Sequence, residues 1–286
     1  MKHQFPSYYT VWNKLGFYSL KLSAWAVLFF LILPIVVIVP LSFNIEPYFT
    51  FTKGMVMLDP AAYSMRWYEE IVANENWILA IKNSFFIGIF ATIIATSLGT
   101  LAAVGLSSEN MPFKRHIMAL MLSPMIVPLI IIAAGMFFFY TKFNIAGTYL
   151  GLIIAHAALG VPFVIITVTA TLTGFDRSLY FAGLSMGASP LRTFFDIVFP
   201  MIRPGVISGA MFAFVTSFDE VVLVLFLAGP GQRTIPRQMF SGLREQINPT
   251  ILAVATLLIL TSIIFLFTLE YLRRRSERLR GLVEQT

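Results

Sequence analysis

Cysteine is missing from this 286-residue sequence, and histidine occurs only three times. Without cysteine the chain can form neither a disulfide framework nor a thiolate metal site, so cysteine usage says nothing about its redox compartment. The three histidines also lack the spacing that metal ligands show in known sites. We therefore expect no metal site in this chain.

Charged residues are scarce as well, at 12% of the sequence against 58% hydrophobic residues. This composition and the mean hydropathy of +0.82 differ strongly from those of a soluble domain. A net charge of +6 would suit a nucleic-acid partner, but in a membrane protein basic residues collect in cytoplasmic loops. The composition indicates an integral membrane protein without a nucleic-acid partner.

Six stretches are long and apolar enough to cross a bilayer, since a helical crossing needs about 20 residues. They comprise residues 20–43, 84–106, 117–140, 149–172, 205–227 and 251–271. All are continuously apolar, whereas the strands of membrane barrels alternate over about ten residues. The sequence predicts an all-α integral membrane fold, a single domain over residues 1–286, with kinks at the prolines inside the spans.

The basic residues predict the orientation of these spans. Six crossings put both termini on one side, which holds most lysines and arginines, including the cluster from Arg273 to Arg280. The loop over residues 44–76, on the other side, is rich in acidic residues. Both termini are therefore expected in the cytoplasm. We interpret the C-terminal cluster as a stop-transfer anchor rather than a patch that binds lipid or nucleic acid.

Residues 173–203 form a long loop on the same side as the termini, too apolar for a free loop. A helix is predicted from Ser178 to Met186, with Gly187 as its C-cap. Ser189 then suits an N-cap, and Pro190 the first position of a second helix, which we expect to end near Pro200. The predicted motif is helix, tight turn, helix.

This segment resembles the coupling loop of permeases in binding-protein-dependent ABC importers. The signature of that loop runs Glu-Ala-Ala, three residues, Gly, nine residues, Ile, one residue, Leu-Pro. Here the matching residues are Ala182, Gly187, Ile197 and Pro200, whereas Phe181, Gly183 and Phe199 replace the Glu, the second Ala and the Leu. The resemblance implies that the ATPase is contacted by Tyr180, Phe181, Ala182, Gly183, Gly187, Ala188, Ser189, Ile197 and Pro200. The lost Glu implies a more apolar contact.

The resemblance also implies the fold, partners and location. The fold would be the six-helix type I ABC importer permease, in a bacterial inner membrane. The chain lacks the phosphate-binding pattern G-x-x-x-x-G-K-[ST]. ATP and magnesium would therefore be bound by a separate ATPase dimer, and this chain would not be an enzyme. The other partners would be a second permease, giving a heterodimer, and a periplasmic or extracellular solute-binding protein.

The stretch from Ser217 through Gly229-Pro230 to Pro249 is similar to the polyamine and opine branch of these permeases, which includes the second permease of spermidine/putrescine systems. The resemblance implies a small cationic solute such as a polyamine, or else an opine, an amino acid or another small amino compound. A secondary transporter or channel acting alone would show inverted repeats or charged relays. A membrane enzyme would need a catalytic cluster. Neither pattern is visible.

Three polar residues inside the spans are candidates for the substrate pathway, because charged groups at mid-span are costly. Asp219 and Glu220 are neighbours in the fifth span; on a helix they would point about 100° apart. One of them could instead cap a helix or pair with Lys82 or Arg233. His156, in the fourth span, could be a satisfied core residue or contact the solute.

Two further patterns bear on packing. Small residues at Gly88, Ala91, Ala95, Gly99 and Ala103 recur nearly every four positions, which predicts close helix contact. Residues 229–248, punctuated by Gly-Pro-Gly, are expected either to form a short amphipathic helix near the outer gate or to remain a solvated loop.

Overall fold

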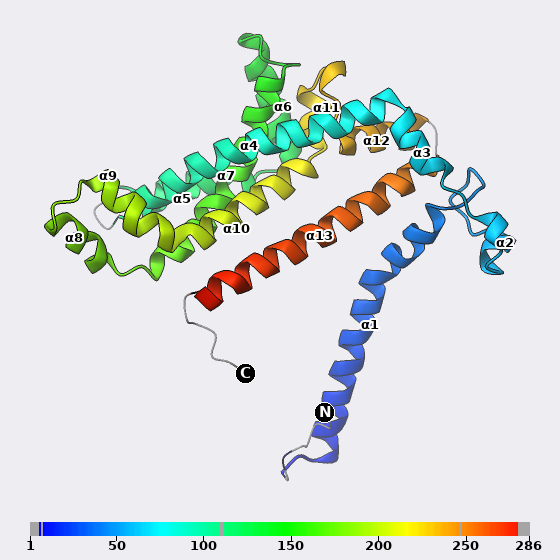
Figure 1. The fold of residues 1–286 in the computed structure, drawn as a ribbon, viewed down its shortest axis with the longest axis horizontal. Coiled ribbons are helices and arrows are strands. Elements are labelled where there is room, and N and C mark those ends of the chain that lie inside the picture. The colour runs from blue at the N-terminus through cyan, green and yellow to red at the C-terminus, as the bar shows by residue number, and fades with distance from the viewer. Residues whose placement is uncertain (1–5, 7, 109–110, 246–247, 280–286) are drawn as a thin grey trace. The chain divides into compact units, whose positions relative to one another are not determined.

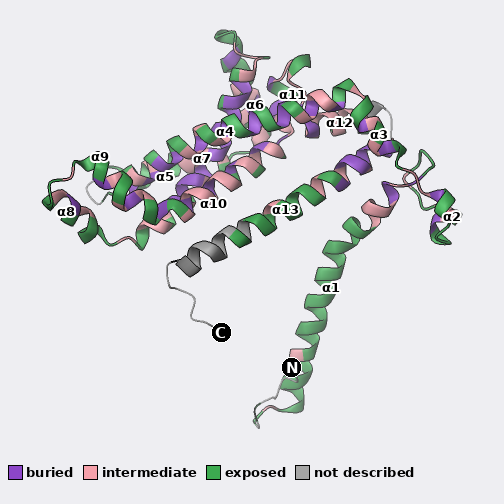
Figure 2. Ribbon diagram, in the orientation of Figure 1, coloured by how far each residue is buried: buried purple, intermediate pink, exposed green. Residues whose placement is uncertain are grey.

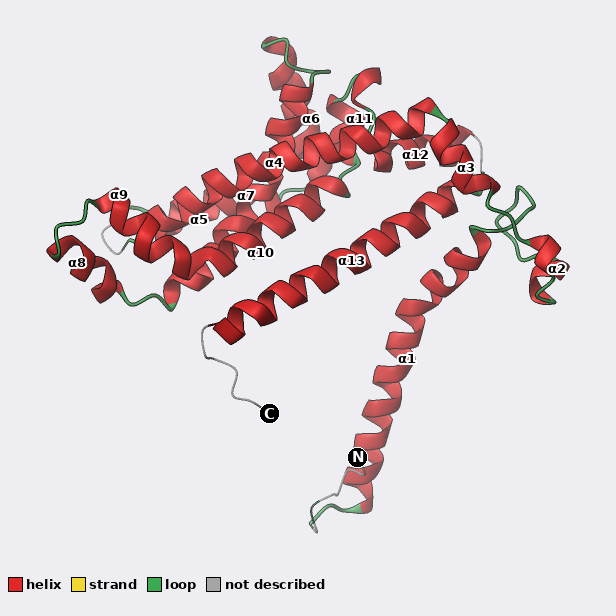
Figure 3. Ribbon diagram, in the orientation of Figure 1, coloured by secondary structure: helices red, strands yellow, loops and turns green. Residues whose placement is uncertain are grey.

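The computed structural model describes residues 6, 8–108, 111–245 and 248–279, and within these residues it contains helices but no strand (Figure 3). Lys2 and the side chains of the basic cluster from Arg273 to Arg280 lie outside what is described. The long helices are α1 (Val11–Leu41), α4 (Glu75–Ser107), α7 (Tyr149–Thr173), α10 (Phe199–Phe218) and α13 (Thr250–Leu279) (Figure 1).

Residue contacts divide the chain into two compact units, which are described separately. The first comprises Met1–Ile71 with Gln246–Ile264, and the second comprises Val72–Glu245 with Phe265–Thr286. The prediction of a single permease domain therefore stays a prediction.

The second unit is built on α4, α7 and α10, which pack pairwise. The small residues of α4 allow this close packing. Ala91, Ala95 and Ala103 are buried, and a Cβ added at Gly99 would lie 2.6 Å from the Cβ of Val164 on α7. In a membrane, where lipid is as apolar as the helices, such close approach is what favours their association. The predicted helix contact is confirmed.

The third predicted span is broken in the structure. Helix α5 (Lys114–Leu122) runs into a short 3-10 turn, and after a break the chain continues as α6 (Leu129–Lys142), bent by 97° from the preceding segment. Pro128 stands at the break. It has no amide hydrogen to donate, and it pushes the residue before it away from helical geometry. The prolines thus produce a full break where the sequence suggested a kink.

The fifth predicted span starts earlier and ends earlier than residues 205–227. Helix α9 (Pro190–Thr193), the π-helical segment η3 (Phe194–Val198) and α10 form one continuous helical stretch, Pro190–Phe218, with Pro200 and Pro204 inside it. The chain then leaves helical geometry before α11 (Val222–Leu227). Our expectation of an end near Pro200 and a continuous helix through Asp219 and Glu220 was wrong.

A smaller helix, α12 (Ile235–Glu245), follows α11 and packs against α4. Residues 229–248 therefore contain the short helix that was expected, not an extended loop. A 3-10 turn, η4 (Pro230–Gln232), precedes it.

The first unit contains α1, the beginning of α13 and the segment between α1 and α4. That segment folds into α2 (Lys53–Val56), the 3-10 turn η1 (Pro60–Ala62) and α3 (Arg66–Ala73). The indole of Trp67 donates to the carbonyl of Asn44 (2.6 Å), and the hydroxyls of Ser42 and Tyr68 lie 2.6 Å apart. These bonds fix α3 to the chain that leaves α1.

Within the described residues, five helices are long and apolar enough to cross a membrane, or six if the bent pair α5–α6 forms one span. The most apolar part of α1 is not buried in the chain at all, and the helix is exposed over most of its length (Figure 2). By contrast, 67% of the most apolar part of α7 is buried in the chain. Exposed apolar helices of this length are stable only where lipid or another protein covers them.

Candidate functional site

The segment between α7 and α10 forms a helical hairpin. Its first helix, α8 (Arg177–Ser185), is capped by Asp176, whose carboxylate accepts from the Ser178 amide at 2.9 Å. Hydrogen bonds from the backbone and side chain of Ser178 lower the pKa of Asp176. The chain then turns at Gly187, whose φ of +86° favours glycine. The predicted helix and glycine turn agree with the structure.

The second helix of the hairpin begins as the sequence predicted. The hydroxyl of Ser189 accepts from the Arg192 amide (3.3 Å), and Pro190 follows at the first helical position. Gly183 on α8 faces this helix so closely that an added Cβ would lie 2.8 Å from Ile197 Cδ1 and 2.9 Å from Thr193 Cγ2. The glycine that replaces the motif's second alanine therefore allows the two helices of the hairpin to touch.

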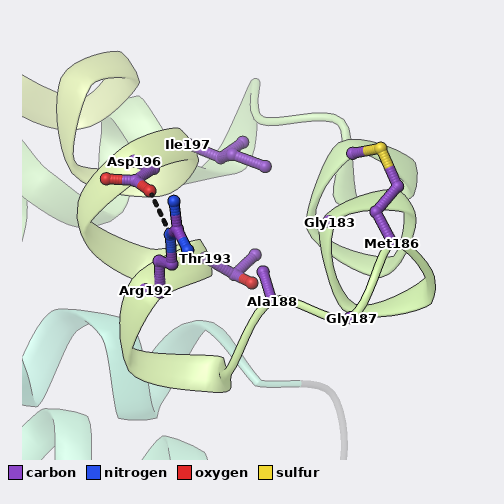
Figure 4. A pocket seen from close by; sticks show the side chains of 8 residues that line it. All are labelled: Gly183, Met186, Gly187, Ala188, Arg192, Thr193, Asp196 and Ile197. Atoms are coloured by element: carbon purple, nitrogen blue, oxygen red, sulfur yellow. Dashed lines mark hydrogen bonds and ion pairs between the residues drawn. The ribbon is translucent and has the colours of Figure 1, made fainter.

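A hollow of about 370 Å³ lies between the two helices (Figure 4). Figure 4 shows Met186 on the α8 side and Arg192 with Asp196 on the opposite helix. These two form an exposed ion pair, Nε to Oδ2, at 3.2 Å. The hollow is lined by Gly183, Met186, Gly187, Ala188, Arg192, Thr193, Asp196 and Ile197.

The hairpin also carries exposed apolar side chains. Phe181 is 60% exposed, Met186 80% and Leu191 70%. Ala182, Ser189 and Pro200 are exposed too, and Ala188 is half-buried. Tyr180, in contrast, packs against the buried cluster shared by α4, α7 and α10. The hairpin is thus anchored on the helix bundle by one set of side chains and presents another set outward.

A second contact ties the hairpin to the bundle. The guanidinium of Arg177, the first residue of α8, donates to the carbonyl of Ser107, the last residue of α4. A cation at this place also interacts favourably with the negative end of the α4 dipole. The hairpin is therefore joined to α4 through a side chain and to α10 through the continuous backbone.

Asp219 and Glu220 lie in the break between α10 and α11. Asp219 is exposed and ends α10, whereas Glu220 is only 8% exposed. The Glu220 carboxylate accepts from the Leu223 amide at 2.9 Å and so caps α11. The helical arrangement expected for this pair was wrong, because the chain leaves helical geometry between them. The alternative of a helix cap holds for Glu220.

His156 lies on α7 and is buried against α10, with 1% of its surface exposed. Its Nδ1 lies 2.8 Å from the hydroxyl of Ser217 and 3.2 Å from the Ser217 carbonyl, two residues before the break. Nε2 has no partner within the described part of the chain. The histidine is a core residue with one nitrogen satisfied, and its role in the pathway stays a prediction.

Asn83 belongs to Lys82-Asn83-Ser84, which the sequence indicates to be an interfacial anchor rather than a binding group, and its role as a structural contact was not predicted. Its buried amide donates to the carbonyls of Gly231 (2.9 Å) and Arg233 (2.8 Å), and its oxygen accepts from the Tyr149 hydroxyl (2.9 Å). The neighbouring hydroxyl of Ser84 accepts from the first amide of α12, at 2.9 Å. The N-terminal third of α4 therefore holds the η4–α12 segment in place. The only sequence signal is an amide and a hydroxyl at the edge of an apolar run.

We expect Asn83→Asp to release the η4–α12 segment. A carboxylate has the shape of the amide but places an oxygen opposite two carbonyl oxygens, so both hydrogen bonds become repulsive contacts. Proteolysis of the purified chain within residues 228–245 should then be at least tenfold faster. Tyr149→Phe, which removes only the hydroxyl, should change the rate much less. Equal rates for Asn83→Asp and the unmodified chain would contradict this role.

Apolar helices long enough to cross a membrane, joined by a helical hairpin between α7 and α10, indicate an integral membrane protein. The family model of the binding-protein-dependent transport system inner membrane component matches residues 95–278, and the chain belongs to this family. It is the permease subunit of an ABC importer, and the hydrolysis of ATP belongs to a separate subunit in such systems.

Curated relatives cover nearly the whole chain. It is 32% identical to the putrescine transport system permease protein PotI of Escherichia coli K12, over 88% of this chain and 89% of that protein. It is also 28% identical to the spermidine/putrescine transport system permease protein PotC of Haemophilus influenzae, over 86% of this chain and 93% of the relative.

Solved structures support the fold. A chain of a bacterial ABC transporter that imports the acidic polysaccharide alginate matches with a TM-score of 0.70 at 12% identity, covering 93% of this chain and 99% of that one. The same type of transporter in complex with its pentasaccharide-bound periplasmic protein matches with a TM-score of 0.67 at 15% identity, covering 92% and 95%. The fold is that of type I ABC importer permeases.

Proposed function

We propose that this permease forms half of the pathway for a small cationic solute of the polyamine class. The likeness to putrescine and spermidine/putrescine permeases over most of the chain carries this proposal. Exposed Asp219, at the break of the fifth span, supports it, because a carboxylate near a pathway raises the local concentration of cations. The second candidate is an opine or amino acid, which shares the cationic amino group.

The hairpin of α8 and α9 couples this permease to the ATPase dimer. It is stiffened by two helix caps and the Gly183 contact, and its second helix continues without a break into α10. A displacement of the hairpin by the partner would therefore move the spanning helix as a rigid body. A second, different permease would complete the pathway, a soluble binding protein would deliver the solute, and both termini would lie in the cytoplasm.

Reconstitution tests the proposed solute. The chain is co-purified with its partners, inserted in liposomes, and supplied with the binding protein and either putrescine, spermidine, an opine or an amino acid. ATP hydrolysis and uptake should rise together with a polyamine. Stimulation by the opine or amino acid alone would select the second candidate, and stimulation by none of them would refute the proposed solute class.

Asp219 and Glu220 should respond differently to the loss of charge. Asp219→Asn should lower polyamine uptake about tenfold at low solute concentration, because the exposed carboxylate no longer attracts the cation. Glu220→Gln keeps an oxygen that accepts from the Leu223 amide, so uptake should change little. Uptake by both variants in the same liposomes is the measurement. Normal uptake by Asp219→Asn would remove this residue from the proposed pathway.

Phe181 should contribute apolar binding energy to the ATPase contact. Because its ring is 60% exposed in this chain, burial by a partner would be worth about 1 to 2 kcal/mol. Phe181→Ala should weaken the association of permease and ATPase about tenfold, and the association should vary little between low and high salt. A strong salt dependence in the unmodified complex would instead indicate that charged groups dominate the contact.

A further inference from the structure

Three consecutive aliphatic side chains project from the segment between α1 and α4. Val56 is 72% exposed, Met57 79% and Leu58 76%, and these three residues are called the α2 tip. Scattered apolar residues are normal on protein surfaces, but three adjacent ones at this exposure form a patch with no partner in the described chain.

The α2 tip is held in one conformation by the backbone beneath it. The amides of Met57, Leu58 and Asp59 donate to the carbonyls of Lys53, Met55 and Gly54, at 3.0, 3.1 and 2.9 Å. The start of α2 is fixed by the Thr52 hydroxyl, which accepts from the Met55 amide at 3.3 Å. The patch is therefore a built feature and not a flexible loop end.

Leu58 has a φ of +57°, in the left-handed region where helix ends favour glycine or asparagine. A branched side chain is disfavoured there, and this one makes no buried contact within the described chain. A leucine is thus found where the backbone alone would favour glycine. The side chain is best explained by a contact outside the chain.

The position of the tip indicates what that contact is. Met55, the residue before it, is 3% exposed and belongs to a cluster with Leu41, the last residue of α1. Val37, one turn inside α1, and Leu252, in the first turn of α13, pack against the same cluster. The α2 tip therefore begins directly after Met55, which packs against the end of α1 and the beginning of α13.

We propose that the α2 tip inserts into the lipid interface of the membrane surface at which α1 ends and α13 begins. At the end of a spanning helix, aliphatic side chains can enter the boundary between lipid headgroups and acyl chains, where their burial is favourable. Lys53, exposed beside the tip, has a long side chain whose ammonium can reach lipid phosphates. The proposal does not depend on which solute is transported.

Because this chain has no cysteine, a single introduced thiol can be labelled in it, and any label on the partner subunits is measured with the unmodified transporter and subtracted. Met57→Cys in the assembled transporter is labelled with the fluorophore NBD and placed in phosphatidylcholine vesicles. Lipids carrying a nitroxide near the headgroup should quench the label by half or more. Iodide in the water should quench it at least threefold less than the same label at Glu69→Cys, an exposed position on the neighbouring helix α3.

Because NBD itself favours membranes, a second variant isolates the contribution of the tip. Adding Val56→Ser and Leu58→Asn should lower the lipid quenching of the Met57→Cys label at least twofold, since asparagine tolerates the left-handed conformation. Quenching by iodide equal to that of the Glu69→Cys control would overturn the proposal. So would protection from iodide that occurs without lipid quenching, or only after binding protein is added, because the tip would then be a protein contact.

Discussion

Replacing Gly183 with valine is expected to abolish the coupling of ATP hydrolysis to transport. A Cβ at this position would already lie 2.8 Å from Ile197 and 2.9 Å from Thr193, and the two methyl groups of valine add further overlap. Overpacking of this kind costs about 1 to 3 kcal/mol and is relieved by moving the helices apart. Helix α8 would therefore shift from the position in which we propose that it contacts the ATPase.

We expect solute-stimulated ATP hydrolysis by the reconstituted complex to fall at least tenfold in Gly183→Val. Gly183→Ala, which restores the residue of the family motif, should give a smaller loss, because the tip of the Ile197 side chain can move. Ser185→Val introduces the same residue at an exposed position of the same helix and should leave the activity near normal. Similar activity in Gly183→Val and Ser185→Val would contradict the role of this contact.

Gly99→Val should have the largest effect on the helix bundle itself. The added Cβ would lie 2.6 Å from the Cβ of Val164 and 3.2 Å from the Val161 carbonyl oxygen. The first atom is bonded directly to the backbone and the second is part of it, so a change of rotamer moves neither. Helices α4 and α7 would have to separate. We expect a loss of about 3 kcal/mol or more in stability.

Thermal unfolding of the purified chain in detergent measures this effect. Gly99→Val should show a lower melting temperature and a several-fold lower yield of monodisperse protein. Gly105→Val is the matched control, since Gly105 lies on the same helix with nothing within 4 Å of its added Cβ. If the two variants melt alike, the close contact of α4 and α7 is not what holds the bundle together.

Much of the fold follows from hydropathy and from local capping signals. Long apolar runs must form helices in lipid, because every backbone polar group has to be satisfied within the segment. The turn at Gly187 and the cap at Ser189 are local features with specific residue preferences, so the sequence is sufficient to predict the hairpin. The family motif lies on the same residues, which made the class of protein predictable.

Other features depend on tertiary contacts and could not be predicted. The helical stretch that includes α10 continues through Pro200 and Pro204, whereas the helix breaks at Pro128. The residues next to these prolines do not predict which of them ends a helix. Likewise, the break at Asp219 has no glycine or proline to mark it. The function of Asn83 arises from carbonyls far away in the sequence, at Gly231 and Arg233. Such pairings are fixed by the packing of helices, not by neighbouring residues.

We propose that the exposed side chains of the hairpin bind an ATPase that moves this permease. The most direct measurement is co-purification of the tagged chain with its co-expressed partners, from cells that carry either the unmodified hairpin or Gly183→Val. We predict that an ATP-binding cassette ATPase purifies with the unmodified chain and that its amount falls at least tenfold with Gly183→Val. Purification of a folded chain with no ATPase, or with equal amounts in both cases, would contradict the proposed role of the hairpin.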